Sequence, residues 1–310
     1  MLLLHYIKLH NFQKENLSIM NSKTSIFILT GVFFLSFFSC SDDIEISNDD
    51  FFLFGIDGYD NARELLGAYA GLGDSSNDGL IKFSTRTTIG IDDDIRTQGS
   101  IRTFFVPIEG SNTGADVGVF KIGDIEAHYQ DDGLYEPINA GSNSFEIGER
   151  LADLSGTQVN LSIVSDDGSE VLSQDVYFPE DINASFDNEG RAESTSIFLV
   201  NREDFTLRWQ RDSQNQNGLL LGLIYRNQSL DDQLPNGTND TDGTPFERVL
   251  LLDESGAITL DEELFQGIPQ NGVATLMLMR GEVSSISDSQ ARTFQVQALH
   301  QQSFSLGFLD

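Results

Sequence analysis

Apolar and polar residues alternate in short runs along the chain from Leu80 onward, and this alternation limits the possible folds more than any other feature of the sequence. Side chains on a β-strand point alternately to opposite faces, so each run has one face to bury. The runs are rich in Val, Ile, Phe and Thr, and clusters of Gly, Asn, Asp and Ser separate them, as is usual for antiparallel strands and their turns. Because apolar stripes of helical length are nearly absent, the sequence predicts an all-β protein.

Strands and turns can be placed on this pattern. The predicted strands are Leu80 to Gly90, Ile101 to Ile108, Gly118 to His128, Gln158 to Ser165, Glu170 to Phe178, Ser196 to Val200, Phe205 to Arg211, Leu219 to Arg226, Glu247 to Asp253, Ala257 to Leu260, Val273 to Glu282, Arg292 to His300 and Ser303 to Leu309. Asp166-Asp167-Gly168 and Glu254-Ser255-Gly256 are predicted hairpin turns, because glycine tolerates the positive φ that such turns require.

The length of 310 residues favours two domains, since one hydrophobic core usually serves roughly 100–200 residues. Strands without intervening helices bury one face against another sheet, which predicts β-sandwich modules with an immunoglobulin-like or fibronectin-like outline. The best boundary lies near Asn183 to Ser194, where the stretch SFDNEGRAEST is polar and poor in apolar anchors. We therefore expect an N-terminal β-rich domain over 51–183 and a C-terminal β-sandwich domain over 195–310.

The amino terminus carries an export signal. Ser25 to Phe38 reads SIFILTGVFFLSFF, an uncharged apolar run that follows Lys23. Such a run is shorter than the roughly 20 apolar residues of a membrane span, but it has the length of a secretory h-region behind a basic n-region. Residues 1–39 are therefore a predicted signal peptide, and Met20 is an alternative start that would give a compact signal sequence.

Cys40 is the sole cysteine, and it follows the apolar run and a small residue. The stretch Leu35-Ser36-Phe37-Phe38-Ser39-Cys40 resembles a lipobox, although Phe37 and Phe38 stand where Leu and a small residue are usual. This resemblance implies that Cys40 becomes a lipidated first residue, since two or more acyl chains anchor a protein stably. Residues 40–50 would then be a short acidic tether, and Ser41-Asp42-Asp43-Ile44-Glu45 looks like the export signal of surface-displayed lipoproteins of Bacteroidota-type bacteria. The resemblance implies an outer-membrane lipoprotein exposed at the cell surface.

The second predicted domain has a weaker resemblance. FTLRWQRDSQNQNGLLLGLIYRN and ITLDEELFQGIPQNGVATLMLMRG look like sandwich modules in secreted and surface proteins of the same bacteria. This likeness implies a fold and no activity. Trp209 alternates with Phe205 and Leu207 on one strand face, which favours a core residue over an exposed sugar-stacking platform.

The charge of the chain limits its partners. Asp and Glu total 49 against 18 Lys and Arg, for a formal net charge of −31. Such a surface repels phosphate backbones and argues against nucleic-acid binding. The predicted partners are the membrane, through the lipid anchor, and an outer-membrane protein or a glycan.

Two sets of residues are candidates for ligand binding. Asn236, Asn239, Asp240 and Asp242 lie in a glycine-containing stretch whose oxygen-bearing side chains suit calcium, and a plain loop is the alternative. Calcium is the only cofactor that the sequence suggests. Sugars stack on planar rings, so Tyr129, Tyr135 and Tyr225 are candidates for glycan contacts, with ordinary packing as the alternative.

Catalytic motifs are absent from the sequence. It contains no P-loop, no Rossmann glycine fingerprint, no HExxH and no GxSxG elbow. A Ser-His-acid hydrolase would have to use His128 or His300, and a glycoside hydrolase needs only two carboxylates, which so acidic a chain supplies in many places. The sequence thus favours a non-enzymatic lipoprotein that acts as a binding or assembly module. A structural envelope component without a small ligand and a carboxylate-based glycoside hydrolase are the alternatives.

Overall fold

The computed structural model describes residues 78–91, 94–106, 115–130, 133–137, 144–192, 195–230 and 244–309. All of them belong to one compact unit, Phe51–Asp310. The predicted signal peptide, Cys40 and the four calcium candidates lie outside the described residues, so those predictions stay predictions. Within the described ranges, no helix is both long and apolar enough to cross a bilayer.

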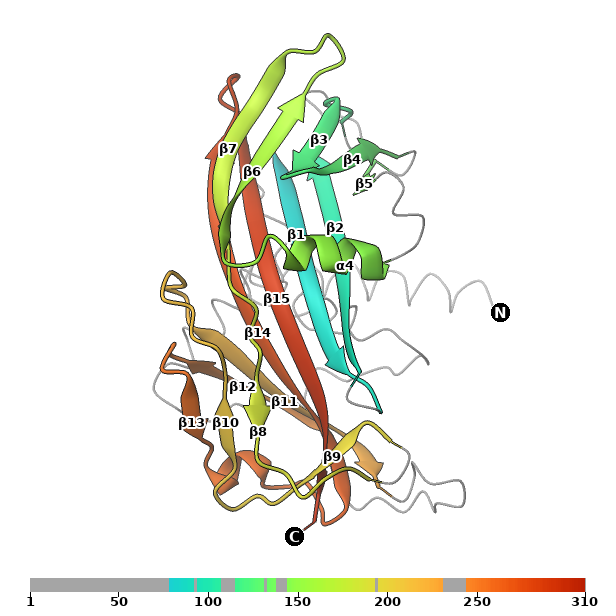
Figure 1. Ribbon diagram of the computed structural model, residues 1–310, viewed down its shortest axis with the longest axis vertical. Helices are drawn as coiled ribbons and strands as arrows, with labels where there is room; N and C mark the ends of the chain where they lie inside the picture. The colour runs from blue at the N-terminus through green and yellow to red at the C-terminus, as the bar shows by residue number, and fades with distance from the viewer. Residues whose placement is uncertain are drawn as a thin grey trace, which may run out of the picture. The chain divides into compact units, whose positions relative to one another are not determined.

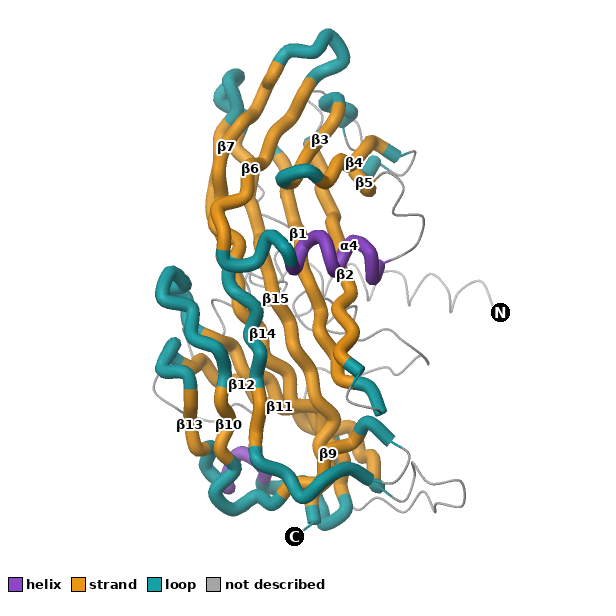
Figure 2. The backbone as a smooth tube through the Cα atoms, in the orientation of Figure 1, coloured by secondary structure: helices purple, strands orange, loops and turns teal. Residues whose placement is uncertain are grey.

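Strands make up most of the described residues, which confirms the predicted all-β class (Figures 1 and 2). They are β1 (Gly79–Ile89), β2 (Ile95–Phe105), β3 (Val119–Ile122), β4 (Ile125–Tyr129), β5 (Tyr135–Pro137), β6 (Thr157–Val164), β7 (Glu170–Phe178), β8 (Ser185–Phe186), β9 (Ile197–Val200), β10 (Thr206–Arg208), β11 (Leu219–Ser229), β12 (Phe246–Leu252), β13 (Ala257–Thr259), β14 (Gly272–Ser287) and β15 (Thr293–Phe308). The helices are α4 (Ser144–Ala152) and the 3₁₀ helix η2 (Glu262–Phe265).

Twelve strands form one sheet in the order β12-β11-β14-β15-β1-β2-β5-β4-β3-β6-β7, with β9 paired to β15 beside this path. β13, β10 and β8 form a second sheet of three strands. β1 runs parallel to β15, so strands from the two predicted domains share one sheet. The division into 51–183 and 195–310 is therefore not confirmed. The parallel pair and the twelve-stranded sheet also differ from the two antiparallel sheets per domain that an immunoglobulin-like outline implies.

The hairpin of β14 and β15 supports two hydrophobic cores. Phe294 and Val296 of β15 belong to the first core, and Phe304 and Leu306 belong to the second. All four residues are even-numbered, and residues of one parity lie on one face of a strand, so both cores pack on the same face of the hairpin. Figure 1 shows the two long strands running past β1, β6 and β7 at one end and past β8 and β10 at the other.

The first core lies between β14, β15, β1 and β2 on one side and β3 to β7, which continue the same sheet, on the other. Phe83 of β1 meets Phe178 of β7 edge-on at 5.1 Å between ring centroids. Phe105 of β2 is fully buried, and its ring contacts Phe120, Tyr135 and Phe294 edge-on at 6.0, 5.2 and 5.3 Å. Edge-to-face pairs are favourable because the positive edge of one ring faces the negative face of another. These rings join strands that are distant in the sequence.

The second core lies between β11, β12, β14 and β15 on one side and the three-stranded sheet with η2 on the other. Phe205, Leu207 and Trp209 are buried in it. This confirms the prediction that the alternation around Trp209 marks a core face. Because 6% of Trp209 is exposed, its ring offers no surface on which a sugar could stack.

Local boundaries differ from the prediction at several places; β2, for example, begins at Ile95 and not at Ile101. The predicted strand Gly118 to His128 is a hairpin, β3 and β4, that turns at Gly123 with φ of +57°. The turn at Glu254-Ser255-Gly256 joins two sheets and not one hairpin, because β12 pairs with β11 while β13 pairs with β10. β15 runs without a break through His300, where the sequence had suggested an end.

Helix α4 lies against β2 at two glycines. A Cβ atom at Gly148 would lie 2.3 Å from the carbonyl oxygen of Thr97, and one at Gly99 would lie 2.6 Å from the amide nitrogen of Gly148. The absence of both Cβ atoms therefore lets the helix backbone touch the strand backbone.

Gly148→Ala tests this contact. Helix propensity alone would favour alanine by about 1 kcal/mol, but the Cβ atom would meet a backbone oxygen that cannot rotate away. We expect the collision to outweigh the propensity and to lower the free energy of unfolding by about 1–3 kcal/mol in urea titrations. Glu149→Ala, at the next and exposed position of the same helix, should change it by less than about 0.5 kcal/mol. A stabilised Gly148→Ala protein would refute the close packing.

Candidate functional site: the Arg280 cluster

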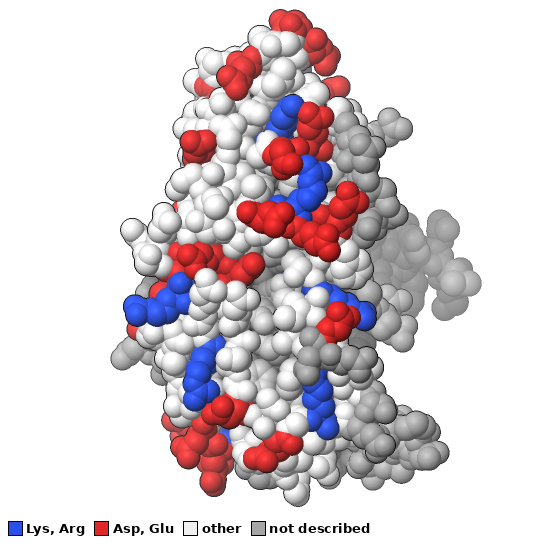
Figure 3. Space-filling model, viewed as in Figure 1, with Lys and Arg blue, Asp and Glu red and all other residues white. Residues whose placement is uncertain are grey.

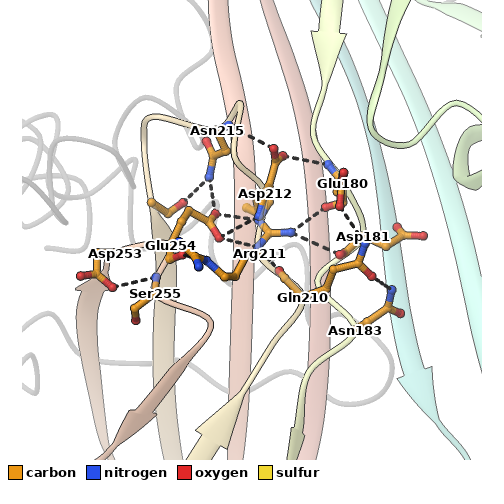
Figure 4. Close-up of polar contacts among 12 residues, drawn as sticks. Glu180, Asp181, Asn183, Gln210, Arg211, Asp212, Asn215, Asp253, Glu254 and Ser255 are labelled. Carbon is orange, nitrogen blue, oxygen red and sulfur yellow. Dashed lines mark hydrogen bonds and ion pairs between the residues drawn. The ribbon is translucent and has the colours of Figure 1, made fainter.

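A polar cluster separates the two cores on the shared face of β14 and β15. We call it the Arg280 cluster, and it consists of Glu180, Asp181, Gln210, Asp212, Asn215, Glu254 and Arg280. Figure 4 labels all of these residues except Arg280. Its residues come from the segment after β7, the segment after β10, the turn after β12, and β14. Because three connecting segments from different parts of the chain contact one strand here, the cluster lies where the two halves of the unit are joined.

Arg280 is fully buried and supplies the centre of the cluster. Its Nε and Nη2 atoms donate to the two carboxylate oxygens of Glu254 at 2.9 and 2.7 Å. Nη1 donates to the carbonyl oxygens of Glu180 and Asp181 at 2.9 and 3.2 Å, and Nη2 donates to that of Gln210 at 2.6 Å. A guanidinium has five N–H groups, and these five bonds use all of them. The forked pair with Glu254 is the strong, geometrically specific kind of ion pair.

Asp212 is the second buried charge of the cluster. Its carboxylate accepts from the hydroxyl of Tyr177 at 2.8 Å and from the amide nitrogens of Glu180, Gln214 and Asn215 at 3.0, 2.9 and 3.1 Å. Burial acts to raise the pKa of Asp212, but these hydrogen bonds outweigh it and hold the pKa below its ordinary value. Burial raises the pKa of Tyr177, and its bond to Asp212 adds to the rise. Asp212 is thus ionised and Tyr177 neutral.

Glu282 lies on the same face of β14, two residues beyond Arg280. Asn217 Nδ2 donates to its carboxylate at 3.1 Å. Burial raises the pKa of Glu282, and the charge of Asp212 raises it further. Two carboxyl groups with opposed pKa shifts are a pattern of acid–base catalysts, so this pair is the closest approach to a hydrolase among the described residues.

His300 lies opposite Arg280 across the β14–β15 ladder and is buried. Its Nδ1 atom is 2.5 Å from the hydroxyl of Thr85 and 3.0 Å from a carboxylate oxygen of Asp181, and its ring stacks on Phe178 at 4.2 Å. A nucleophile–His–acid triad needs the hydroxyl and the acid on different ring nitrogens. Here both lie at Nδ1, and Nε2 has no hydrogen-bond partner. His300 is therefore not arranged as a triad base.

The geometry of the cluster fits a structural role better than a catalytic one. Every donor of Arg280 and the carboxylate of Asp212 are occupied by the protein itself, so neither is directed at a ligand. Within the ranges that the structure covers, no group of three or more His, Cys, Asp or Glu side chains is placed to hold a metal ion. What the cluster does is hold the segments after β7, β10 and β12 against β14.

The prediction that three tyrosines could contact a glycan requires a correction. Tyr135 and Tyr225 are each fully buried, and their hydroxyls bond to Asp116 at 3.1 Å and Asn227 at 3.3 Å. Both rings belong to hydrophobic cores and have no face in solvent, so the expectation of exposed rings is wrong for them. Tyr129 is half-buried and packs edge-on against Tyr135 at 5.7 Å. The three rings do not form one site, because Tyr225 lies in the other core.

Sequence reasoning missed Arg280 and its partners, although one signal pointed to Arg280. It has the same parity in its strand as Ala274, Leu276 and Leu278, all of which are buried. A charged residue on the apolar face of a strand needs a buried partner. The sequence could therefore have predicted a partner for Arg280, but not that Glu254 would supply it.

Comparisons with known proteins give no evidence about the function of this chain. No known protein family matches the sequence, and curated protein sequences give no significant match. One solved structure, described as "Structural insight into host cell surface retention of a 1.5-MDa bacterial ice-binding adhesin", is 12% identical to this chain. The alignment covers 74% of this chain and 66% of that one, just under two thirds of its length, with a TM-score of 0.13. A TM-score this low supports no inference, so the function must be argued from the chain's own residues.

Proposed function

We propose that this protein is an extracytoplasmic lipoprotein, anchored through Cys40 in the outer membrane and displayed at the cell surface, that acts as a binding or assembly module. The observation that carries the proposal is the position of the sole cysteine in the sequence, one small residue, Ser39, after a 14-residue apolar run, Ser25 to Phe38. The acidic residues that follow it suit a solvated tether.

The described residues support binding over catalysis. Their densest polar cluster is saturated by its own hydrogen bonds, and His300 has hydroxyl and acid at the same ring nitrogen. Extended strands packed around two cores form a rigid support, and binding residues are often found on such supports. On the face shown in Figure 3, acidic and basic side chains are intermingled.

A carboxylate-based glycoside hydrolase is the second candidate, and it would use Asp212 and Glu282. Asp212→Asn and Glu282→Gln would each abolish release of reducing sugar if this candidate were right. We expect no sugar release from the parent, because Asp212 is 1% exposed and already accepts four hydrogen bonds.

Cys40→Ser tests the proposed anchor. The serine cannot carry the thioether-linked lipid, so we expect the variant to leave the membrane fraction while the parent stays in it. Mass spectrometry of the amino-terminal peptide should find acyl chains on the parent only. Ser39→Ala is the matched control, since it keeps a small residue before the cysteine and should leave acylation unchanged. If Cys40→Ser remained with the membranes as the parent does, the anchor would be disproved.

A further inference from the structure

The twelve-stranded sheet has a second apolar face, opposite to the two cores. On β14 and β15 its residues are the odd-numbered ones, because neighbouring residues of a strand point to opposite faces. The strand register places Leu220 of β11 beside Met279 of β14, and Gly281 of β14 beside Leu299 of β15. We call this surface the outer face, and its apolar residues are Leu220, Ile224, Met277, Met279 and Leu299.

The outer face is buried, although neither core covers it. Leu220, Met277 and Leu299 are each 2% exposed, and Met279 and Ile224 are 5% and 6% exposed. None of the five side chains belongs to either core. The side chains of an open sheet face stand out from the backbone into water, whichever strands lie beside them. Exposed fractions this low therefore require a further layer of protein over the outer face.

The sequences of β11 and β14 point to the same layer without reference to exposure. β11 begins with LLLGLI and β14 contains LMLM, so apolar residues fill consecutive positions on both faces. A strand with one face in water alternates instead, as EVLSQDVYF of β7 does. β1 and β15 also run parallel, an arrangement that is usual where both faces of a sheet are covered.

The described elements that cover this sheet do so on its opposite face. Leu151 of α4, Phe178 of β7 and Leu207 of β10 all lie in the two cores, so these elements pack on the side of the cores. The layer over the outer face therefore comes from a part of the chain outside the described ranges.

Composition identifies which part of the chain this is. The stretches 107–114, 138–143 and 231–243 each contain a single Leu or Ile and no aromatic residue. Residues 51–77 instead contain ten Phe, Leu, Ile and Tyr residues among 27. Residues 1–39 are apolar as well, but they are the predicted signal peptide, and the inference rests on the proposed function in this one respect.

Residues 51–77 can reach the outer face. They end beside Asp78, whose amide donates to the carbonyl oxygen of Thr293 and whose carboxylate accepts from the amide of Thr293, both at 2.7 Å. From Thr293 to Leu299 is about 20 Å along β15, because a strand rises about 3.4 Å per residue. A chain of 27 residues spans up to about 90 Å, so its length is ample.

The pattern of residues 51–77 suits a layer on an apolar sheet face. Leu65, Tyr69 and Leu72 recur at the spacing of one face of a helix, and Phe51 to Phe54 is an unbroken apolar run. We propose that residues 51–77 pack on the outer face and form a third core with it. In a protein anchored through Cys40, only residues 40–50 then remain as a free tether, which holds the fold within about 40 Å of the lipid.

Hydrogen–deuterium exchange of the parent protein tests whether the segment is packed. Peptides from 61–72 should exchange at least about tenfold more slowly than a free chain, because packed backbone amides are sheltered from water. Peptides from β14 provide the reference for full protection. Exchange of 61–72 at free-chain rates would overturn the inference.

Leu220→Ser/Met279→Ser tests where the segment packs. Arg63 is the sole basic residue of 51–77, so trypsin can cut this segment only there. Cleavage after Arg63 should be at least about tenfold faster in the variant, while exchange in β6 and the emission of Trp209 stay those of the parent. Ile95→Ser/Val106→Ser is the matched control, since it removes two side chains that are 68% and 42% exposed, and its cleavage should stay within about twofold of the parent.

Leu65→Ser/Leu66→Ser makes the same test from the segment and leaves the sheet unchanged, so it serves if the outer-face variant does not fold. Combining both pairs of substitutions should speed cleavage no further than either pair alone, because both remove one contact. Equal cleavage of the parent and both variants would refute the packing. Protection of the outer face that rises with protein concentration would assign it to a second copy of the chain and would also refute it. The acylated parent in detergent and Cys40→Ser should behave alike, so loss of the anchor and loss of the packing are separate observations.

Discussion

Replacing Arg280 with methionine should lower the free energy of unfolding by about 3–5 kcal/mol. Methionine fills similar space but removes the positive charge beside the Glu254 carboxylate, which keeps only its bonds from Asn215 and the amide of Asp212. It also takes the Arg280 donors away from three carbonyl oxygens. Breaking a buried ion pair from one side costs this much because an uncompensated charge stays behind. Urea denaturation followed by tryptophan fluorescence measures it well, since the sole tryptophan, Trp209, lies in the second core next to the cluster.

Arg208→Met is the control for Arg280→Met. Arg208 pairs with Asp187 at 3.3 Å, with 49% and 83% of the two side chains exposed. Exposed pairs contribute little, so this change should cost less than about 1 kcal/mol. Equal effects of the two substitutions would mean that the Arg280 cluster does not hold the crossing segments in place. Arg280→Met/Glu254→Met should recover part of the loss, because it removes both charges together.

Phe105→Ala should destabilise the protein by a similar amount, about 3–5 kcal/mol. The ring is fully buried and contacts three other rings, so its loss removes apolar burial and leaves a cavity among strands that cannot close around it. The midpoint of urea unfolding measures the effect. Val106→Ala, at the adjacent position, removes a side chain that is 42% exposed and should cost less than about 1 kcal/mol. A loss below 2 kcal/mol for Phe105→Ala would contradict a well-packed first core.

Period-2 alternation predicted individual strands well. Glu170–Phe178 was placed at the bounds that β7 has, and the turn before it contains Gly168 with φ of +81°. Both features depend only on local residues. The end predicted at His300 is wrong because Gln301 and Gln302 are polar yet buried. The side chain of Gln302 accepts a hydrogen bond from the amide of Ala184 at 2.7 Å, a partner more than a hundred residues away that no local pattern reveals.

The pairing of strands that are distant in the chain could not be predicted either, because no local pattern reveals a distant partner. Nothing in GLIKFSTRTTI indicates that β1 will pair in parallel with β15 and not with a strand of its own half. Helix α4 was also missed, since it has only nine residues and contains Gly148, a weak helix former. The candidate site was also predictable only in part. The position of Arg280 on the apolar face of its strand is visible in the sequence, but Glu254 and Asp212 come from elements that only the folded sheet brings together.

The parallel pairing of β1 with β15 also sets an order of events during biosynthesis. A ribosome releases β1 long before it makes β15, so β1 must wait for a neighbour that lies about two hundred residues downstream. Loops of that length close slowly, which predicts slow folding and a long-lived chain without its central strand pair. Nascent chains that stop short of Thr293 should stay sensitive to protease throughout, because the middle of the sheet does not yet exist in them.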